Sequence, residues 1–250
     1  MKNILIIGRN SFLGSNLKIY LSKFYKVNIY SYEQIIKKKR EFFSNYSYVI
    51  NTSIHKKYIK EKYKIKYDLD RNFLKKFKKI NFYYIFINSR KIYSIKENIN
   101  EKSRLKPLDN YSKNKITTEK FIKKNFKNRF ISLRVSNVIG KKIVKNLRNN
   151  HKLFFDNFLL YKKKKKNFKI IIDNDFKDFL SIEQFCKIIF KIVRFNLRGI
   201  YNVSISKKIY LSEIIEWLDK KFLKKIEFKA TSKNSFTLSN SKLLRKIKIK

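Results

Sequence analysis

The sequence is poor in the residues that set special backbone conformations or form covalent cross-links. Its 250 residues include four glycines, one proline, one alanine and one cysteine. The lone cysteine, Cys186, excludes an internal disulfide, and two histidines do not provide the ligands typical of a zinc site. We therefore predict no metal and a free buried thiol, in a chain long enough for one large domain with a dependent cap.

Long apolar runs are also missing. No stretch approaches the roughly 18 apolar residues that a membrane-spanning helix needs. The first residues, MKNILIIG, lack the apolar core and the cleavage site of a signal peptide. We expect a cytoplasmic protein that has no membrane partner.

Negative charge is scarce and positive charge is abundant. The chain has 63 Lys and Arg against 18 Asp and Glu, a formal net charge of +45. Such an excess favours a polyanionic partner, but the lysines are spread over the whole length and no zinc-finger, basic-zipper or RNP motif accompanies them. We interpret most of this charge, including the run 162–166, as solvated surface, and nucleic acid is disfavoured as a partner.

Two of the scarce glycines frame the N-terminal segment ILIIGRNSFLGSNLKIYL. A short apolar strand, a turn between Gly8 and Gly14, and a helix with an apolar stripe follow one another in the order that a dinucleotide-phosphate site needs. Ser11 takes the middle position of the G-x-x-G-x-x-G pattern, where its hydroxyl could donate to a phosphate or weaken binding. The segment alone leaves a strand, turn and helix without a ligand equally open.

Strand-like and helix-like segments alternate along the chain. Further strands are predicted at 26–30, 48–53, 82–89, 129–140 and 168–172, and helices at 68–79 and 112–125. This alternation indicates an α/β fold with a doubly wound parallel sheet, whose ligands gather at the carboxyl ends of the strands. Those ends carry Gly8, Thr52, Ser53, Ser89 and Asn137.

The stretch DNYSKNK, residues 109–115, places Tyr111 and Lys115 four residues apart, on one face of the predicted helix. A nearby ammonium favours the phenolate and suits a tyrosine to exchange protons. The spacing alone proves little, because it recurs. The other pairs with this spacing are Tyr58 with Lys62 and Tyr161 with Lys165. Neither has a serine-bearing strand at the right distance upstream, as Tyr111 has in Ser89.

In their order, these motifs resemble the extended short-chain dehydrogenase/reductase family of nucleotide-sugar epimerases, dehydratases and 4-keto reductases. IFINSRKIYS is similar to the strand that ends in the family's catalytic Ser or Thr, and KPLDNYSKNKITTEKFI to the segment with its Tyr and Lys. LRVSNVIG is similar to the strand whose asparagine touches the nucleotide diphosphate. The resemblance spans nearly all 250 residues. It implies a dinucleotide-binding Rossmann part and a small substrate-binding cap. Their predicted bounds are 1–140 completed by about 175–203, and 141–174 with 204–250.

The resemblance also implies site roles. Tyr111 would exchange a proton with a sugar hydroxyl or ketone while the nicotinamide moves a hydride, Ser89 would hydrogen-bond the same oxygen, and Lys115 would also hold the nicotinamide ribose. Ser89 and Asn137 would bind the substrate. The residues expected around the cofactor are Gly8, Ser11, Phe12, Leu13, Gly14, Ser31, Thr52, Ser53, Tyr111, Lys115 and Ser136.

Two features narrow the reaction. Relatives that dehydrate the sugar carry acidic residues directly after the catalytic Ser or Thr, whereas this chain has Arg90 and Lys91 there. The stretch from Tyr30 to Val49 is too short for an additional β-α-β unit. In this respect the chain resembles the compact dTDP-4-dehydrorhamnose reductase type. We therefore predict an NAD(P)-dependent reductase of a 4-keto sugar nucleotide in polysaccharide precursor synthesis. A nucleotide-sugar epimerase with tightly bound NAD is the alternative.

The cofactor prediction depends on the end of the second strand, where a carboxylate would grip the ribose hydroxyls of NAD. The chain has Ser31 there, with Arg9 and the cluster 37–40 within reach. This favours NADP, and NAD stays open.

A hypothesis of another class is an inactive family member that serves as a binding subunit for a polyanion or a protein. Ser11 in the phosphate turn, Asp68 where relatives have asparagine, and the net charge of +45 support it. The presence of Ser89, Tyr111 and Lys115 argues against this hypothesis, because a catalytically inactive protein has no physical reason to retain all three. Relatives often pair through the helix that bears Tyr111, so a homodimer is a further expectation.

Overall fold

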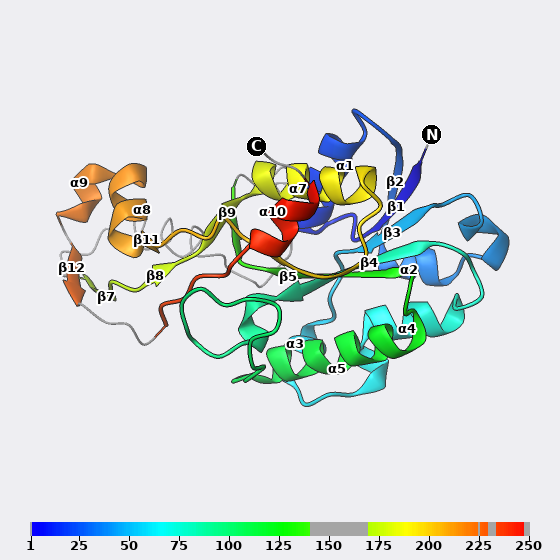
Figure 1. Ribbon diagram of the computed structural model, residues 1–250, viewed down its shortest axis with the longest axis horizontal. Helices are drawn as coiled ribbons and strands as arrows, with labels where there is room; N and C mark the ends of the chain where they lie inside the picture. Colours follow the sequence, from blue (N-terminus) through cyan, green and yellow to red (C-terminus); the bar gives the residue numbers. More distant parts are fainter. Residues whose placement is uncertain (1, 141–169, 225, 230–233, 248–250) are drawn as a thin grey trace.

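A computed structural model describes residues 2–140, 170–224, 226–229 and 234–247 of the chain. Its centre is a six-stranded sheet in which every neighbouring pair of strands is parallel (Figure 1). Across the sheet the strands are β10 (Gly199–Val203), β5 (Phe130–Val135), β4 (Tyr83–Ser89), β3 (Tyr48–Asn51), β1 (Asn3–Ile7) and β2 (Lys26–Tyr30). The chain starts inside the sheet and winds outward in both directions, which confirms the predicted doubly wound α/β fold.

Helices cover both faces of this sheet (Figure 1). The helices on one face are α1 (Phe12–Leu21), α7 (Ile182–Arg194) and α10 (Ser241–Ile247). Those on the other face are α2 (Tyr32–Ile36), α4 (Leu69–Lys76) and α5 (Asn110–Asn125), with α3 (Lys56–Lys60) packed on α5. None of the described helices combines the length and the apolar character that crossing a membrane requires.

Strand β1 shows why the N-terminal segment lies inside the sheet. Ile4 and Ile6 belong to the core beneath α1 and α7, whereas Leu5 and Ile7 belong to the core beneath α4 and α5. All four side chains are completely buried. Successive side chains of a strand point to opposite faces, so an unbroken apolar run is stable only where both faces are covered.

The connection from β2 to β3 is short. It contains only α2 and the 3-10 helix η1 (Arg40–Phe43). Consequently β2 is the edge strand and β3 pairs directly with β1. The prediction that this stretch lacks an additional β-α-β unit is confirmed.

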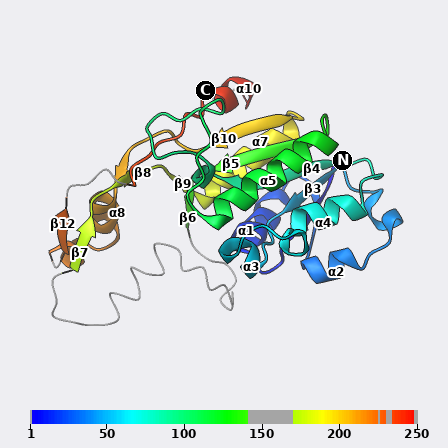
Figure 2. The ribbon, with the colours of Figure 1, turned by 90° about the horizontal axis from the view of Figure 1, so that it is seen from below.

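A smaller lobe lies at the left of Figure 1. It contains β7 (Ile170–Asp173), β8 (Phe176–Lys177), β11 (Ile209–Tyr210), α8 (Leu211–Leu218), α9 (Lys220–Leu223) and β12 (Ile226–Lys229). Between this lobe and the sheet, β6 (Asn137–Ile139) pairs in parallel with β9 (Phe179–Ser181) (Figure 2). Most of the predicted cap segment 141–174, with the lysine run 162–166, lies outside the described residues.

The structure adds detail to three of the predicted segments. The strand expected at 129–140 is divided at Ser136, whose N–H donates to the Val203 carbonyl oxygen at 3.0 Å, before β6 leaves the sheet. The strand expected at 168–172 corresponds to β7, and residues 168–169 lie outside the described part. Helix α10 falls within the predicted cap range 204–250, yet Leu243 and Ile247 pack into the core under β10.

Candidate functional site

The turn between β1 and α1 is packed so closely that two of its positions accept only glycine. Gly8 has φ +120°, and a Cβ there would lie 2.3 Å from Thr52 Oγ1. A Cβ on Gly14 would lie 2.5 Å from the Gly8 carbonyl oxygen. Both distances are far below van der Waals contact, so the two glycines permit the close approach of the turn, the helix and the end of β3.

Ser11 serves the fold of this turn. Its Oγ accepts a hydrogen bond from the Gly14 N–H at 2.8 Å and so caps α1. It also lies 2.6 Å from Thr52 Oγ1, which donates to the Ile7 carbonyl oxygen at 2.9 Å. In this arrangement the Ser11 proton goes to Thr52, and none is left for a phosphate. The donors that remain include the first two N–H groups of α1, on Phe12 and Leu13, which are unpaired among the described residues.

A cavity of about 580 Å³ opens on one side of this turn. Among the predicted cofactor residues, five line it, from the ends of β1, β2 and β3: Gly8, Ser11, Ser31, Thr52 and Ser53. Ser31 caps α2, where its Oγ accepts the Gln34 N–H at 3.3 Å. The carboxyl ends of three parallel strands thus form the walls of one cavity, as expected for a nucleotide site in this fold.

The same cavity contains charged side chains that the sequence reading missed. Glu33, Lys56 and Lys57 line it beside Ser31. The prediction of NADP assumed that no carboxylate stands near the end of β2, and Glu33 removes that premise. It was missed because α2 begins at Tyr32 and its first turn carries Glu33 to the cavity.

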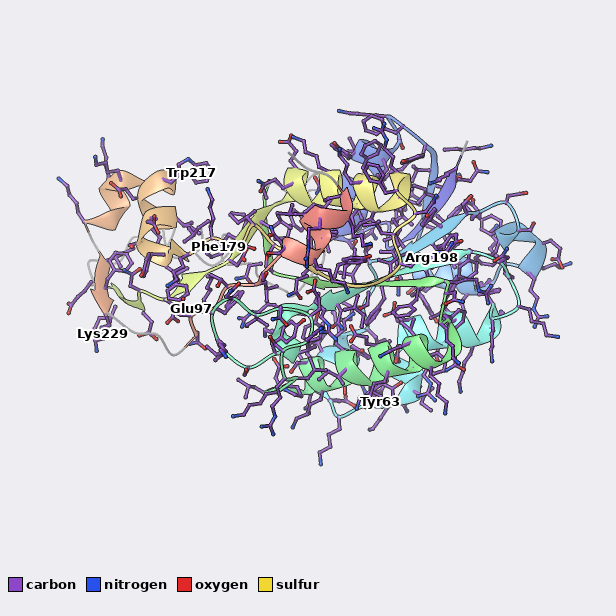
Figure 3. The ribbon with its side chains drawn as sticks, viewed as in Figure 1. Tyr63, Glu97, Phe179, Arg198, Trp217 and Lys229 are labelled. Atoms are coloured by element: carbon purple, nitrogen blue, oxygen red, sulfur yellow. The ribbon has the colours of Figure 1, made fainter. Side chains whose placement is uncertain are left out.

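A second cavity of about 410 Å³ lies on the other side of the turn. It brings together predicted residues from four segments: Phe12 and Leu13 of α1, Ser89 of β4, Tyr111 of α5, and Ser136 with Asn137 after β5. Ser136 Oγ is buried and has no hydrogen-bond partner among the described residues. The small lobe contributes Lys177 and Leu211 to one side, and Phe179 of β9 lies beside them where the lobe meets the sheet (Figure 3).

Lys115 lies behind this cavity. The residue is 5% exposed, and its Nζ donates to the carbonyl oxygen of Ile87, which lines the cavity, at 2.8 Å. The Nζ is 5.9 Å from the centre of the Tyr111 ring. Helix α5 begins at Asn110, where the Asp109 carboxylate accepts the Ser112 N–H at 2.8 Å, so Tyr111 lies in the first turn with Lys115 one turn later. The spacing of four therefore places phenol and ammonium on the same side of the helix.

Ser89 is held by a buried polar chain that sequence reasoning missed. Asn88 accepts the Ser89 N–H at 2.8 Å and donates to Glu119 Oε2 at 2.7 Å. Glu119 in turn pairs with Arg134 at 2.6 Å. Burial alone would raise the pKa of Glu119, but the Arg134 guanidinium and the Ser132 hydroxyl keep it below its usual value. The carboxylate therefore stays charged and fixes the end of β4 against α5.

The alternative pair of Tyr58 and Lys62 lines neither of the two cavities. Tyr58 is buried, its hydroxyl lies 2.7 Å from Thr118 Oγ1, and burial raises its pKa far above the usual range. Asp68, noted as a departure from relatives, caps α4 and accepts the Arg71 N–H at 2.9 Å. Both therefore have structural roles, and the pair of Tyr161 and Lys165 lies outside the described residues.

No group of three or more His, Cys, Asp or Glu side chains within the described residues could hold a metal ion. The fold and the cavities define a class: a Rossmann-type α/β protein with a close glycine-containing turn after β1 and with Ser89, Tyr111 and Lys115 beside it. The chain belongs to the NAD dependent epimerase/dehydratase family, whose model matches residues 4–204. A search of curated proteins finds no match to the sequence.

Solved structures with different reactions share this fold. A UDP-N-acetylglucosamine 4-epimerase from Methanobrevibacter ruminantium, in complex with UDP-N-acetylmuramic acid, has a TM-score of 0.77 and 18% identity, over 100% of this chain and 92% of that one. A dTDP-4-dehydrorhamnose reductase from Bacillus anthracis, in complex with NADP, has a TM-score of 0.75 and 16% identity, over 98% and 91%. A dTDP-glucose 4,6-dehydratase from the same species, in complex with NAD, has a TM-score of 0.74 and 16% identity, over 100% and 91%. These identities establish the fold and leave the reaction open.

Proposed function

We propose that this chain is a cytoplasmic NAD(P)-dependent oxidoreductase of nucleotide sugars, and that it reduces a 4-keto sugar nucleotide for polysaccharide synthesis. The observation that carries the proposal is the meeting of Ser89 and Tyr111 in one cavity, with Lys115 directly behind it. The cavity on the other side of the turn would take the adenosine half of the cofactor. Asn137, in the cavity of Ser89, would bind the nucleotide diphosphate, as in the family it resembles.

A dinucleotide held at the turn between β1 and α1 would supply the hydride for the carbonyl carbon of the sugar. Tyr111 gives its phenolic proton to the carbonyl oxygen, and Ser89 hydrogen-bonds the same oxygen, so that negative charge does not build up on it. The Lys115 ammonium stabilises the phenolate that remains until the proton is replaced from water. The ketone becomes an alcohol, with one hydride and one proton consumed.

The residues after Ser89 support hydride transfer without dehydration. Arg90 and Lys91 occupy positions where dehydration would need carboxylates to move additional protons. The connection from β2 to β3 is short and leaves β2 as the edge strand of the sheet. This resemblance to the compact reductase type supports the reductase over the epimerase. An epimerase remains the second candidate, because the fold is shared with one; it would retain NAD through purification and interconvert stereoisomers without consuming NADPH.

The cofactor cavity supports both forms of the dinucleotide. Lys56 and Lys57 would attract the 2′-phosphate of NADP, whereas the Glu33 carboxylate would accept hydrogen bonds from the free ribose hydroxyls of NAD. We therefore propose NADP or NAD without preference.

The proposed function is tested by NAD(P)H consumption with a panel of 4-keto nucleotide sugars. Tyr111→Phe should lower kcat by about 10²-fold to 10⁴-fold with little change in KM, because it removes the proton donor and leaves the ring. Tyr25→Phe removes a hydroxyl from a tyrosine that lines neither cavity and should keep wild-type rates. Activity that survives Tyr111→Phe would refute the assigned mechanism.

Absence of turnover in the wild type would favour the rival, an inactive subunit that binds a polyanion. Binding to nucleic acid should then fall steeply as salt rises, with a log–log slope of about −0.9 for each phosphate contacted. Binding of NAD(P)H in a partly enclosed cavity should depend on salt far less.

A further inference from the structure

An aromatic cluster covers the ends of α1 and α7 and lines neither cavity of the site. The centre of the Phe24 ring, just after α1, lies 4.4 Å from the centre of the Phe190 ring of α7. Tyr20 and Tyr25 extend the cluster, with ring centres 5.8 Å from those of Phe24 and Phe190 respectively. The two helices pack side by side on one face of the sheet (Figure 1). Two distant segments of the chain therefore build one continuous cluster.

The cluster continues into apolar side chains that are open to solvent. Phe24 is 44% exposed, and Ile19, which precedes Tyr20 on α1, is 52% exposed. Phe195, directly after α7, is 41% exposed, and the guanidinium carbon of Arg194 lies 6.0 Å from the centres of both the Phe195 and the Phe190 rings. Single exposed apolar residues are common, whereas a connected group of them marks an interaction site. We call this group the apolar patch: Ile19, Tyr20, Phe24, Tyr25, Phe190 and Phe195.

Positive charge surrounds the apolar patch. Lys23, Lys191 and Arg194 place their cationic groups within 6.0 Å of ring centres of the patch. The sequence of α1 contains no acidic residue. Glu183, the one acidic residue of α7, pairs with the Lys187 ammonium at 2.9 Å. The charges around the patch therefore complement an anionic partner, and they oppose a second copy of this chain, which would bring the same cations together.

The apolar patch lies at the edge of the sheet opposite to the two cavities. Helix α1 leads into the start of β2, and α7 leads into the start of β10. Because the strands of the sheet are parallel, both helices end at its amino edge. The cavities lie at the carboxyl ends of the strands. A partner that covers the patch therefore leaves both cavities open.

We propose that the apolar patch binds the surface of an anionic lipid bilayer. Its rings and Ile19 would enter the boundary between head groups and acyl chains, while the long cationic side chains around them reach the lipid phosphates. The prediction of no membrane partner rested on the lack of a spanning segment, and a peripheral contact needs none. The inference does not depend on the proposed function.

A nucleic acid would fit this patch less well. Its bases bind such surfaces by stacking on open ring faces. Cationic groups lie over the rings of Tyr20, Phe190 and Phe195 and occupy faces that bases would need. Acyl chains need no open ring face, so the arrangement favours the bilayer.

The first test places a fluorescent probe in the patch. The chain has one tryptophan, Trp217, which is 79% exposed on α8 of the small lobe (Figure 3). Its emission in the wild type should not change when vesicles of phosphatidylcholine and phosphatidylglycerol are added. Phe24→Trp in a Trp217→Phe background should shift its emission to shorter wavelength with these vesicles, and lipids brominated in the acyl chains should quench it. Quenching of the wild type, or no quenching of the Phe24→Trp protein, would overturn the proposal.

The second test separates the apolar patch from the overall charge, because a chain of net charge +45 is attracted to anionic vesicles in any case. Co-sedimentation with the same vesicles is measured in high salt, which screens surface charge. Ile19→Ala and Phe195→Ala should each lower vesicle affinity by about 3-fold to 10-fold, because each removes a half-exposed apolar side chain from the contact. Leu108→Ala, at a 66% exposed apolar position outside the patch, should keep wild-type affinity.

All three alanine variants should bind NAD(P)H as the wild type does, which shows that they are folded. Unchanged vesicle affinity in Ile19→Ala and Phe195→Ala would leave charge alone as the cause and overturn the proposal. The same two variants losing affinity for single-stranded DNA but not for vesicles would assign the patch to a nucleic acid and would also overturn it.

Discussion

Asp70 of α4 carries a fully buried carboxylate in a position where its charge is costly. Its Oδ1 accepts hydrogen bonds from Asn51 Nδ2 at 2.9 Å and from the Tyr84 hydroxyl at 2.6 Å. Burial raises the pKa of Asp70 from 3.8 to about 6, although the Lys115 ammonium acts in the opposite direction. The carboxylate is thus poorly stabilised as an anion, and replacing it by an amide tests this directly.

The magnitude follows from the two pKa values. A rise from 3.8 to about 6 corresponds to about 3 kcal/mol between the charged and neutral forms in the folded state. Between these pH values the folded chain holds a proton on Asp70 that the unfolded chain has lost, so the free energy of unfolding decreases as pH rises. Above about 6 the full cost is present. Asp70→Asn keeps an oxygen for Asn51 and Tyr84 and removes the charge.

We expect the stability of Asp70→Asn relative to wild type to increase by about 2.4 kcal/mol from pH 4 to pH 7, because the unfolded chain has already lost part of this proton at pH 4. Urea unfolding of both proteins across this range measures the difference, and other titrating groups cancel. Tyr84→Phe is the matched variant, because it removes one donor to the carboxylate and should move the pH of the change upward. A difference between Asp70→Asn and wild type that does not vary with pH would refute the reasoning.

Two further predictions concern the turn and the polar chain behind Ser89. Gly14→Ala places a Cβ 2.5 Å from the Gly8 carbonyl oxygen, and should lower stability by about 1–3 kcal/mol and abolish NAD(P)H binding in a fluorescence titration. Ile19→Ala, at an exposed position of the same helix, should retain binding. Glu119→Gln leaves the Arg134 charge buried and should cost about 3–5 kcal/mol at pH 7 in urea unfolding. Because the folded pKa of Glu119 is below its ordinary 4.5, this loss should shrink as pH falls below about 4.5; a constant loss would contradict it.

The parts of the site that could be predicted from sequence depend on local patterns. A strand, a turn and a helix in succession fix the position of Gly8 and Gly14, and a spacing of four on a helix brings Tyr111 and Lys115 to one face. The role of Ser11 could not be read in this way, because its partner Thr52 is 41 residues away. Two possibilities were open for this hydroxyl, donation to a phosphate or weaker cofactor binding; in the structure it caps α1 and lies beside Thr52.

Residues that reach the site only through tertiary packing could not be identified from any local pattern in the sequence. Lys177 belongs to a two-residue strand of the small lobe and meets Ser89 only because that lobe closes on the sheet. Arg90 was noted as the absence of a carboxylate, and its guanidinium carbon lies 3.7 Å from the centre of the Phe236 ring, a contact between residues 146 positions apart that no local pattern indicates.

The high positive charge of the chain opposes the predicted homodimer. The outer face of α5 exposes Lys113, Lys120, Lys123 and Lys124, so two copies paired through this helix would bring eight ammonium groups together. Like charges in contact cost several kcal/mol unless anions intervene. The inner face of the same helix carries Tyr111, Lys115 and Glu119 at successive turns, and Glu119 reaches Asn88, the residue before Ser89. One helix therefore fixes the relative placement of phenol, ammonium and serine within a single chain, and the proposed chemistry needs no second copy.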